Sequence, residues 1–407
     1  PFSVILMRIR SNHYLCQTLF FIASLITNLQ LLMTSTYPMC VYCWSQDPKC
    51  FNLIQVFSVF TRLLPQNLSY IVSVRASYII CLISTLSFFS IISLFLFYKP
   101  HSIFSPNSLP FLPAFSVFLL EILCFPLASL TVFFWFEQGN DHGNYPAIIC
   151  TICLCFCLFG SRIYDHILHC LPNFPKLYGI KWTLPQFYIK KFLCLLTFIL
   201  VEVQPHIPKL WGKILSTSVI VLIFLLLTVD IIYFCDGLIF EYNVLCTFTY
   251  FSACIFHFVA IFSFFTKERP GVYATLFIIL SFPLSLLSFL FCRIRIAYFH
   301  RVFISAFHDK KYDVIDRMPV RLLLSCIGNN LHLIYNDFSI LDHIAEVHSN
   351  DFDVLSLYAK FAALTFTHFS KLQELLGALK QLCNLSFAQQ IQCIFLEILS
   401  LQDENTS

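Results

Sequence analysis

The stretch ILSTSVIVLIFLLLTVDIIYF, from Ile214 to Phe234, decides the fold class of this chain. As a helix, its 21 residues reach roughly 31 Å, the thickness of a bilayer's hydrocarbon core. Fifteen of them are Leu, Ile, Val or Phe, and each contributes roughly 0.3 to 0.6 kcal/mol toward insertion. Asp230 opposes insertion by at most about 3 kcal/mol, and by less in the last turns, where a carboxylate can reach the headgroups. The segment is therefore predicted to be a transmembrane helix.

The composition extends this prediction to most of the chain. Hydrophobic residues make up 58% of it, charged residues only 12%, and the mean hydropathy is +0.78. These values are typical of a polytopic membrane protein and not of a soluble domain. The chain has 48 Phe and only 9 Gly, and no alternation between apolar and polar residues, which favours an all-α bundle over a β-barrel. A net charge of +3 is too small to indicate a nucleic-acid partner.

Seven further apolar segments bring the prediction to about eight transmembrane helices, within a range of seven to nine. The segments are Leu15–Tyr37, Tyr78–Tyr98, Leu112–Phe136, Ala147–Ile167, Phe192–Val203, Val244–Phe265 and Gly271–Cys292. Phe192–Val203 is only 12 residues long, so it either spans by extending back through Phe187 or enters and leaves on one side. The apolar stretch Phe51–Leu64 is interrupted by Arg62 and is predicted to lie in the interface.

The distribution of basic residues predicts the orientation. The loop EQGNDHGNYP, residues 137–146, lacks Lys and Arg and is expected to be external. The connection after the fourth span contains Arg162, Lys176, Lys181, Lys190 and Lys191 and is expected to be cytoplasmic. Basic residues also follow the eighth span: Arg293, Arg295, Arg301, Lys310 and Lys311. Both termini are therefore expected in the cytoplasm, with the plasma membrane as the expected location.

Two surface features follow from this orientation. The sequon at Asn67 would lie on the external side, where it is a candidate glycosylation site. The juxtamembrane cluster of Arg293, Arg295 and Arg301 is a candidate contact for anionic lipid, and more simply a stop-transfer flank.

The composition changes after about residue 300, which divides the chain into a transmembrane region, 1–300, and a cytoplasmic helical region, 301–407. Twelve of the 22 acidic residues lie in this second region. Its expected helices include one opened by Asp351 and two with S-x-x-Q start signals at Ser370 and Ser386. One apolar face is predicted from Leu372, Leu375, Leu376, Leu379 and Leu382. Short paired helices of this kind favour a solenoid-like array.

The cysteines and histidines give only weak indications of chemistry. Most of the 19 Cys lie in apolar runs, where they are expected to pack as small apolar residues. Cys40, Cys43 and Cys50 leave a disulfide or, less readily, a zinc site open. The group Asp165, His166, His169 and Cys170 is compatible with a metal site, although a polar helix end at the headgroups explains it more simply. No cofactor, phosphate-binding or catalytic motif is present.

Ionisable residues within apolar spans are the best candidates for a functional site, because charge inside a membrane is costly. The candidates are Glu121, Asp230, Glu202 and His257, with Asp165 beside them. They are compatible with an ion or proton path in which His257 acts as a relay. The simpler interpretation is that those near span ends reach the interface. Glu121 lies deepest in its span, so it is the one that this simpler interpretation explains least.

Two stretches carry a resemblance to a known family. ITNLQLLMTSTYP, residues 26–38, and HSNDFDVLSLYAKFAALTF, residues 348–366, resemble the large multi-pass membrane proteins of protists grouped with the tiny macrocysts proteins. In some of those, a similar membrane region is followed by a helical cytoplasmic part and then by a PAS or an adenylate/guanylate cyclase domain. The resemblance implies that this chain is a fragment of a longer receptor-type protein, with any cyclase activity downstream of Ser407.

We therefore expect an integral membrane anchor or sensor that couples through its helical tail to a cytoplasmic output domain, in intracellular signal transduction. The alternative is a multi-pass transporter or channel that uses the intramembrane carboxylates. The expected partners are the lipid bilayer, the downstream domain and, as an open alternative, further copies of the chain. Whether the chain belongs to an enzyme stays open, because no catalytic residue is found within it.

Overall fold

In a computed structural model, every regular element is a helix among the residues that the structure describes. These are 13–39, 59, 70–97, 111–136, 144–169, 184–234, 240–265, 270–330, 339–365, 369–382, 385, 389–390, 393–394 and 396–397. No strand occurs among them. The all-α prediction is confirmed for this part of the chain.

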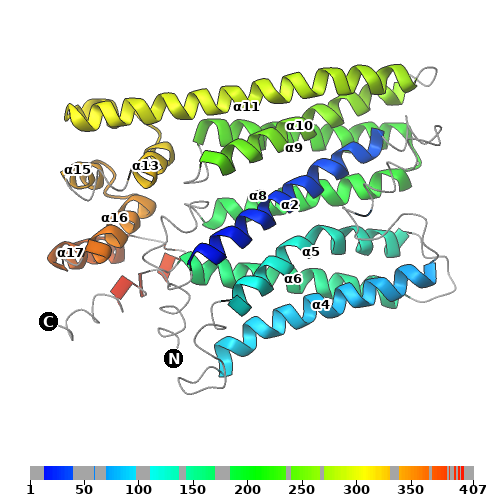
Figure 1. The fold of residues 1–407 in the computed structure, drawn as a ribbon, viewed down its shortest axis with the longest axis horizontal. Helices are drawn as coiled ribbons and strands as arrows, with labels where there is room; N and C mark the ends of the chain where they lie inside the picture. The colour runs from blue at the N-terminus through cyan, green and yellow to red at the C-terminus, as the bar shows by residue number, and fades with distance from the viewer. Residues whose placement is uncertain are drawn as a thin grey trace. The chain divides into compact units, whose positions relative to one another are not determined.

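The chain forms two compact units, and the first contains the long apolar helices (Figure 1). It comprises residues 1–164, 188–230 and 244–291. Its helices, some of which run on into the second unit, are α2 (His13–Met39), α4 (Tyr70–Phe97), α5 (Phe111–Phe136), α6 (Tyr145–His169), α8 (Leu184–Val203), η2 (Gln204–His206), α9 (Leu210–Phe234), α10 (Phe240–Phe265) and the start of α11 (Pro270–His308). Helix α5 packs closely against both α2 and α4.

Four described helices are long and apolar enough to cross a membrane. The segments are Val72–Ser93 of α4, Phe115–Phe136 of α5, Leu210–Tyr233 of α9 and Asn243–Phe262 of α10. Each overlaps a predicted span, so the protein is a membrane protein with several transmembrane helices. The apolar parts of α2 and α6, Phe21–Ser35 and Tyr145–Ser161, are shorter. The full count of eight spans remains a prediction.

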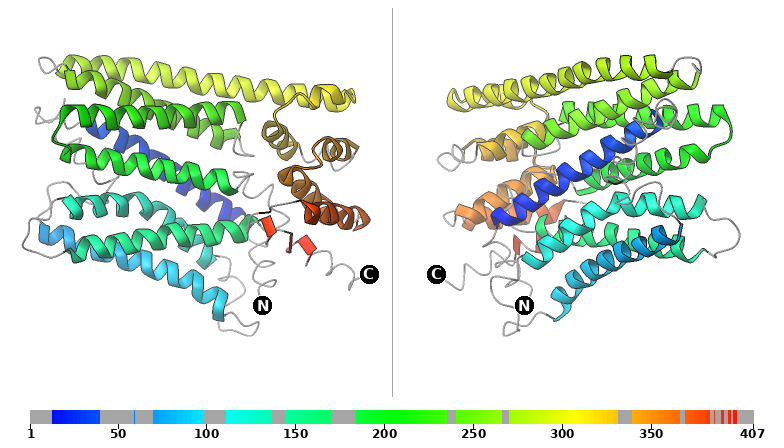
Figure 2. Two further views of the ribbon diagram at one scale, coloured as in Figure 1. Left: turned by 180° about the vertical axis from the view of Figure 1, so that it is seen from behind. Right: turned by 45° about the vertical axis from the view of Figure 1, so that its right-hand side comes forward.

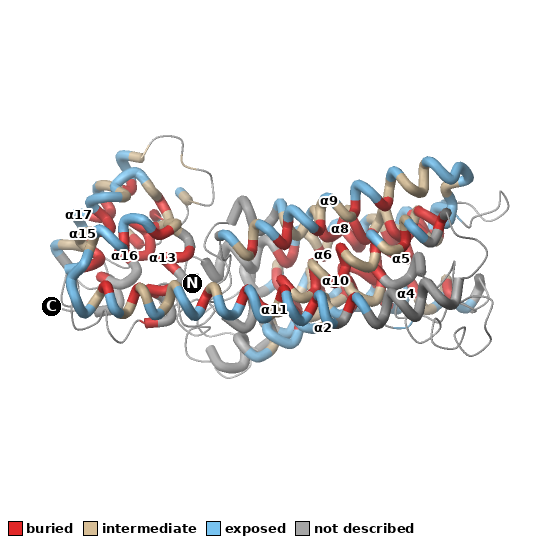
Figure 3. The backbone as a smooth tube through the Cα atoms, turned by 90° about the horizontal axis from the view of Figure 1, so that it is seen from above, coloured by how far each residue is buried: buried red, intermediate tan, exposed pale blue. Residues whose placement is uncertain are grey.

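The exposed face of α9 shows how these helices are built for lipid. Trp211 is 76% exposed and Tyr233 is 53% exposed, near the two ends of the helix. The 22 residues that separate them rise about 33 Å, close to the thickness of a bilayer core. Between them the same face exposes Ser218, whose hydroxyl donates to the carbonyl of Ile214 at 2.8 Å, and otherwise apolar side chains: Leu215, Val219, Leu222, Leu226 and Val229. Aromatic residues at both ends of an apolar face are typical of a membrane-spanning helix, and exposed and buried residues alternate along α9 in Figure 3.

The interior of the first unit is rich in small polar side chains that hydrogen-bond to backbone carbonyls of their own helix. Thr217 and Thr228 of α9 are buried, and each donates a hydrogen bond of 2.7 Å to the carbonyl four residues earlier. Between helices, the hydroxyls of Ser252 in α10 and Ser285 in α11 lie 2.7 Å apart. Small hydroxyl residues allow helices to approach closely and hydrogen-bond in a membrane, where the apolar effect between helices is weak.

Buried cysteines follow the expectation that they pack as small apolar residues. The described cysteines carry free thiols, and all but Cys155 are buried. The sulfur atoms of Cys81 in α4 and Cys150 in α6 are 3.8 Å apart, which places these helices side by side.

Helix α11 runs without a break for 39 residues, through Pro283 and on past the end of the predicted eighth span (Figure 2). The prediction that residues 293–307 continue the last span as a helix is confirmed. The expected domain boundary near residue 300 therefore falls inside a helix, and the last of the points at which the chain passes from one unit to the other lies at residues 291 and 292.

The second unit contains residues 165–187, 231–243 and 292–407. Its described helices are the end of α11, α12 (Tyr312–Ile315), α13 (Val320–Asn329), α15 (Ser339–Val347), α16 (Phe352–Thr365) and α17 (Phe369–Gln381). Phe303 and Ala306 of α11 join the buried core that these shorter helices form. In sequence order α15 packs on α16 and α16 on α17, whereas a repeating array remains a prediction.

Local signals in this unit were predicted with mixed success. The Asp351 carboxylate accepts hydrogen bonds from the amides of Asp353 (2.9 Å) and Val354 (3.3 Å), so it caps α16 as expected. The predicted apolar face of Leu372, Leu375, Leu376 and Leu379 is buried. The start signal at Ser370 is wrong, because α17 already begins at Phe369 and places Ser370 inside its first turn.

Candidate functional site

Helix α8 carries the two lysines on which the candidate site is built. The prediction that Lys190 and Lys191 lie in a basic connection is wrong, and the alternative that the apolar segment extends back through Phe187 is confirmed as a helix. The helix begins at Leu184 and contains both lysines, 20 residues in one element with Phe192–Val203 as its apolar end. Adjacent helical residues point about 100° apart. The two ammonium groups therefore reach different neighbouring helices.

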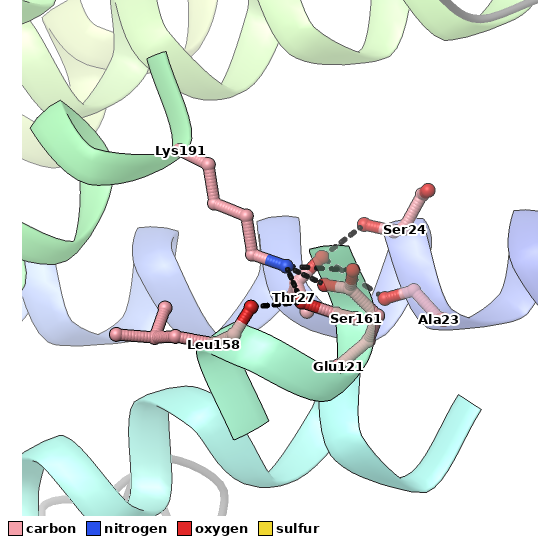
Figure 4. Close-up of polar contacts among 7 residues, drawn as sticks. All are labelled: Ala23, Ser24, Thr27, Glu121, Leu158, Ser161 and Lys191. Atoms are coloured by element: carbon pink, nitrogen blue, oxygen red, sulfur yellow. Dashed lines mark hydrogen bonds and ion pairs between the residues drawn. The ribbon is translucent and has the colours of Figure 1, made fainter. Parts of the chain in front are cut away.

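Lys191 pairs with Glu121, the carboxylate that lies deepest in its predicted span. Its Nζ is 2.6 Å from each carboxylate oxygen of Glu121 in α5 and 3.1 Å from the hydroxyl of Ser161 in α6 (Figure 4). An ammonium group has three N–H bonds, and these three acceptors match that number. The side chains are only 17% and 12% exposed. This group, Lys191, Glu121 and Ser161, joins three helices, and we call it the Lys191 cluster.

A fourth helix reaches the Lys191 cluster through Thr27 of α2. Figure 4 shows the Thr27 side chain beside Glu121 and Ser161. Its hydroxyl is 3.0 Å and 3.1 Å from the carbonyl oxygens of Ala23 and Ser24. Ser161 likewise donates to the carbonyl of Leu158, at 3.2 Å. The hydroxyl protons of both residues are thus held by backbone, and Ser161 is left to accept from the lysine.

Lys190 forms the second ion pair, with Asp230 of α9. Asp230 lies in the last turns of its helix, and its side chain is 33% exposed. The two lysines of α8 therefore bind carboxylates on α5 and α9, so Glu121 and Asp230 have separate partners and do not face each other directly.

These pairs are costly unless they remain intact. Removing a carboxylate or an ammonium group from water costs several kcal/mol per ion, and attraction compensates only where further hydrogen bonds satisfy the group. The Lys191 cluster meets that condition with its serine. Within that cluster, loss of one partner would leave an uncompensated charge that is largely buried, at a cost of roughly 3–5 kcal/mol, whereas the pair of Lys190 with the more exposed Asp230 costs less to break. The two ion pairs, Lys191–Glu121 and Lys190–Asp230, therefore hold α8 to α5 and to α9 in one arrangement, and we call each of them a latch.

The other predicted intramembrane residues lie away from these pairs. Glu202, near the end of α8, is only 3% exposed. His257 of α10 is fully buried, and its ring stacks on Phe224 of α9 with centroids 5.9 Å apart. Among the described residues, neither ring nitrogen of His257 has a hydrogen-bond partner. The structure thus places the four candidates at four positions, on α5, α9, α8 and α10.

The basic cluster after the last span is not uniform. Arg293 and Arg301 are exposed, as lipid contacts require. Arg295 is partly buried, and its guanidinium lies over the rings of Tyr233 (4.8 Å) and Phe299 (5.2 Å). It is therefore engaged with aromatic rings of its own unit.

Several predicted sites fall outside what the structure describes. This applies to Asn67, to Cys40, Cys43 and Cys50, to the interfacial stretch Phe51–Leu64, to Ser386, and to the side chains of Asp165, His166, His169 and Cys170. Within the described residues, no group of three or more His, Cys, Asp and Glu is placed to hold a metal ion.

The sequence did contain a signal for the missed lysines. Acids in apolar segments need counter-charges, and Lys190 and Lys191 immediately precede the apolar run Phe192–Val203. Extending that run back through Phe187, one of the two alternatives that the sequence left open, already brings both lysines into the helix, but the sequence did not indicate which acids they meet.

Comparison of the chain with protein-family models, with curated proteins and with solved structures finds no match.

Proposed function

We propose that this chain is the membrane-embedded sensing part of a signalling protein, in which α11 carries a change from the membrane helices to the helical region that follows. The observation that supports this most directly is the continuity of α11. It is a single helix from Pro270 to His308, and its last turns contribute Phe303 and Ala306 to the core of the second unit. A rigid element shared in this way can transmit a shift or a rotation.

The ion pairs of Lys190 and Lys191 provide the two states, closed and open, between which such a sensor switches. Each latch is stable when closed and costly when half broken, so the bundle favours discrete arrangements over gradual deformation. A stimulus that neutralises Glu121 or Asp230, or competes with a lysine for it, would release α8. In this proposal the protein lies in the plasma membrane with both termini in the cytoplasm. The resemblance to cyclase-linked proteins suggests a downstream nucleotide cyclase as the output.

The test compares amide hydrogen exchange in the protein embedded in lipid nanodiscs, with and without Glu121→Gln. We expect this variant to change exchange in the first unit and also in α13 and α15. Lys209→Gln, which removes an exposed charge, is the matched control and is expected to change neither.

A second variant tests whether α11 is the route. Ile294 and Ala297 are exposed on α11, and replacing both with Gly softens the helix at a cost of about 1 kcal/mol each. In this background the effect of Glu121→Gln on α13 and α15 should be at least halved, whereas Ile294→Ala alone should preserve it. If Glu121→Gln alters the first unit but leaves α13 and α15 unchanged, the signalling proposal is wrong.

A second candidate function is cation transport or conduction through the helical bundle. The specific observation in its favour is the number of ionisable groups that one unit holds at buried or partly buried positions: Lys190, Lys191, Glu121, Asp230 and Glu202. Ionisable residues inside membrane bundles mark ion and proton pathways more often than structural positions.

Transport is tested with purified protein in vesicles of neutral lipid, using trapped dyes that report Na⁺, K⁺ and protons separately. Flux of at least one cation above protein-free vesicles is expected, with a loss of tenfold or more in Glu121→Gln. Absence of flux for all three cations would exclude this candidate function.

A further inference from the structure

The inward face of α10 carries a regular series of polar side chains. Asn243, Thr247, Tyr250, Cys254 and His257 follow one another at steps of four, three, four and three residues, and all five are buried. This spacing keeps them on one side of a helix. Polar residues on that side of a transmembrane helix normally hydrogen-bond to neighbouring helices, so the question for this face is which partners its residues have.

Three contacts place α8 and α9 against this face. The Cys194 thiol of α8 donates a hydrogen bond to the Tyr250 hydroxyl, at 3.5 Å. Phe224 of α9 lies against both Tyr250 and His257, with ring centroids 6.2 Å and 5.9 Å apart. The Cys254 thiol reaches the carbonyl of Val221 at 3.7 Å. The polar residues of α10 therefore face the interior formed by these three helices.

The ends of this interior hold ionisable or polar side chains. Near the start of α8 lie Lys190 and Asp230, and beyond its last residue Gln204 of η2 pairs with Thr217 of α9. Glu202 is eight residues after Cys194, and His257 is seven residues after Tyr250. At 1.5 Å per residue both lie roughly 10–12 Å from the Cys194–Tyr250 contact. Because α9 runs back between them in the sequence, α8 and α10 point the same way, so Glu202 and His257 lie at a similar depth.

His257 is the residue in this series that its surroundings explain least. It is 0% exposed, and among the described residues both ring nitrogens lack a hydrogen-bond partner. A neutral imidazole has one donor and one acceptor, and leaving each unsatisfied costs about 1–3 kcal/mol. Gln204 is also fully buried, and its Oε1 likewise has no hydrogen-bond partner among the described residues. Two such groups in one interior indicate a path that small polar species enter.

We propose that the interior between α8, α9 and α10 is a proton pathway in which His257 is the relay residue between a Glu202 end and an Asp230 end. The proposal rests on the transport candidate above and names its cation. A proton arriving from the Glu202 side binds one ring nitrogen of His257 and gives an imidazolium. The other nitrogen then releases its proton toward Tyr250 and Asp230, and the ring returns to neutral.

The residues that face this path fit protons better than metal cations. Na⁺ and K⁺ need several oxygen ligands converging on one point, whereas α10 offers a file of single groups separated by a turn of helix. Phe224, fully buried between Tyr250 and His257, interrupts the file. Movement of this ring would open the path only briefly and narrowly. A proton carried by one water molecule can pass such an opening more easily than a hydrated metal cation can.

The experiment measures proton flux in vesicles that contain the intact chain and a trapped pH-sensitive dye, driven by a K⁺ gradient with valinomycin. We expect His257→Gln to lower proton flux at least tenfold, because an amide is polar and similar in size but cannot take up and release a proton. His308→Gln, at an exposed position of α11, is the control and should keep the flux of the unchanged protein. Phe224→Leu should raise the flux by removing the aromatic ring from the file.

Folding is checked by the elution volume and melting temperature of each variant in detergent. If His257→Gln fails these checks, His257→Asn replaces it under the same expectation. Flux of Na⁺ or K⁺ without proton flux would overturn the proton pathway and leave cation transport standing. Proton flux that His257→Gln and Phe224→Leu both leave unchanged would overturn the relay alone, and no flux of any cation would remove both.

Discussion

Gly160 of α6 sits where a methyl group has no room. A Cβ atom there would lie 2.5 Å from Cδ1 of Leu120 and 3.0 Å from Cδ2 of Phe88, on α5 and α4. Leu120 is fully buried and cannot move aside freely. Gly377 of α17 is the opposite case, because a Cβ there would meet nothing within 4 Å. One glycine permits three helices to pack, and the other only weakens a helix.

Substituting alanine at each glycine should therefore change stability in opposite directions. Gly160→Ala is expected to destabilise the first unit by about 1–3 kcal/mol through overpacking. Gly377→Ala is expected to stabilise α17 by about 1 kcal/mol, since Ala is the better helix former. Amide exchange protection of α6 and of α17 measures each effect separately. Equal changes at the two positions would show that Gly160 is not a close-packing site.

His300 makes the second unit sensitive to acid. Its Nε2 lies 2.7 Å from the side-chain nitrogen of Asn330, which also donates to the carbonyl of Cys326 at 2.8 Å. Burial lowers the pKa of His300 below its ordinary value of 6.5. The folded state thus binds a proton less readily than the unfolded state does. Stability is complete above the unfolded value and declines as the pH falls through it.

We expect the melting temperature of the second unit to fall by a few degrees between pH 7.5 and pH 5.5. In His300→Gln the decline should be smaller, because glutamine does not titrate. Thermal unfolding in detergent, followed by circular dichroism, measures the melting temperature at both pH values. His308→Gln is the control at an exposed site, and a decline identical in His300→Gln and the control would assign the acid effect to other groups.

At the scale of elements, α8 acts as a bridge and not as an isolated span. Its apolar end resembles the other membrane helices, whereas Lys190 and Lys191 near its start bind acids on α9 and α5. The energetic consequence is strong coupling between residues far apart in sequence. Two buried charges that satisfy each other contribute little net stability, and each alone is a serious defect.

A double-mutant cycle on Lys191 and Glu121 tests this coupling. Lys191→Met and Glu121→Leu are each expected to cost roughly 3–5 kcal/mol, because each leaves one buried charge without its partner. The double variant should be less destabilised than the worse single variant, so the coupling should be at least as large as the smaller single loss, about 3 kcal/mol or more. Thermal unfolding in detergent measures the series. Strictly additive losses would show that the two side chains do not interact.

At the scale of the whole molecule, the orientation in the membrane is open to direct measurement. The positive-inside pattern places the loop at residues 137–146 outside and the basic stretch at residues 309–311 inside. An acceptor site for N-glycosylation introduced into the first should be modified in eukaryotic cells, and one introduced after Lys311 should not. Asn67→Gln should remove one glycan, seen as a faster-running band on a gel.

The pattern of modification also tests the number of spans. Eight spans put five crossings between the loop at 137–146 and Lys311, so the two sites must lie on opposite sides. Modification of both sites, or of neither, would contradict the eight-span topology. Modification of only the second site would reverse the orientation and with it the cytoplasmic location of the helical region.

The amino-acid sequence by itself determined that this is an all-helical membrane protein, because the apolar length of a segment such as Ile214–Phe234 sets its preference for lipid without reference to any neighbour. It also determined the start of α16, because a cap such as Asp351 acts on backbone amides two and three residues away. These are local effects, and local sequence is sufficient for them.

Only the tertiary structure decided which charges meet. Glu121 and Lys191 are 70 residues apart in the sequence. The sequence alone did not indicate which lysine Glu121 binds, because that depends on how α5, α6 and α8 pack together. The same holds for His257, whose burial without a partner depends on α9 lying across α10. Pairing between distant residues depends on how helices pack, and side-chain hydrophobicity alone does not encode that arrangement in any short stretch of sequence.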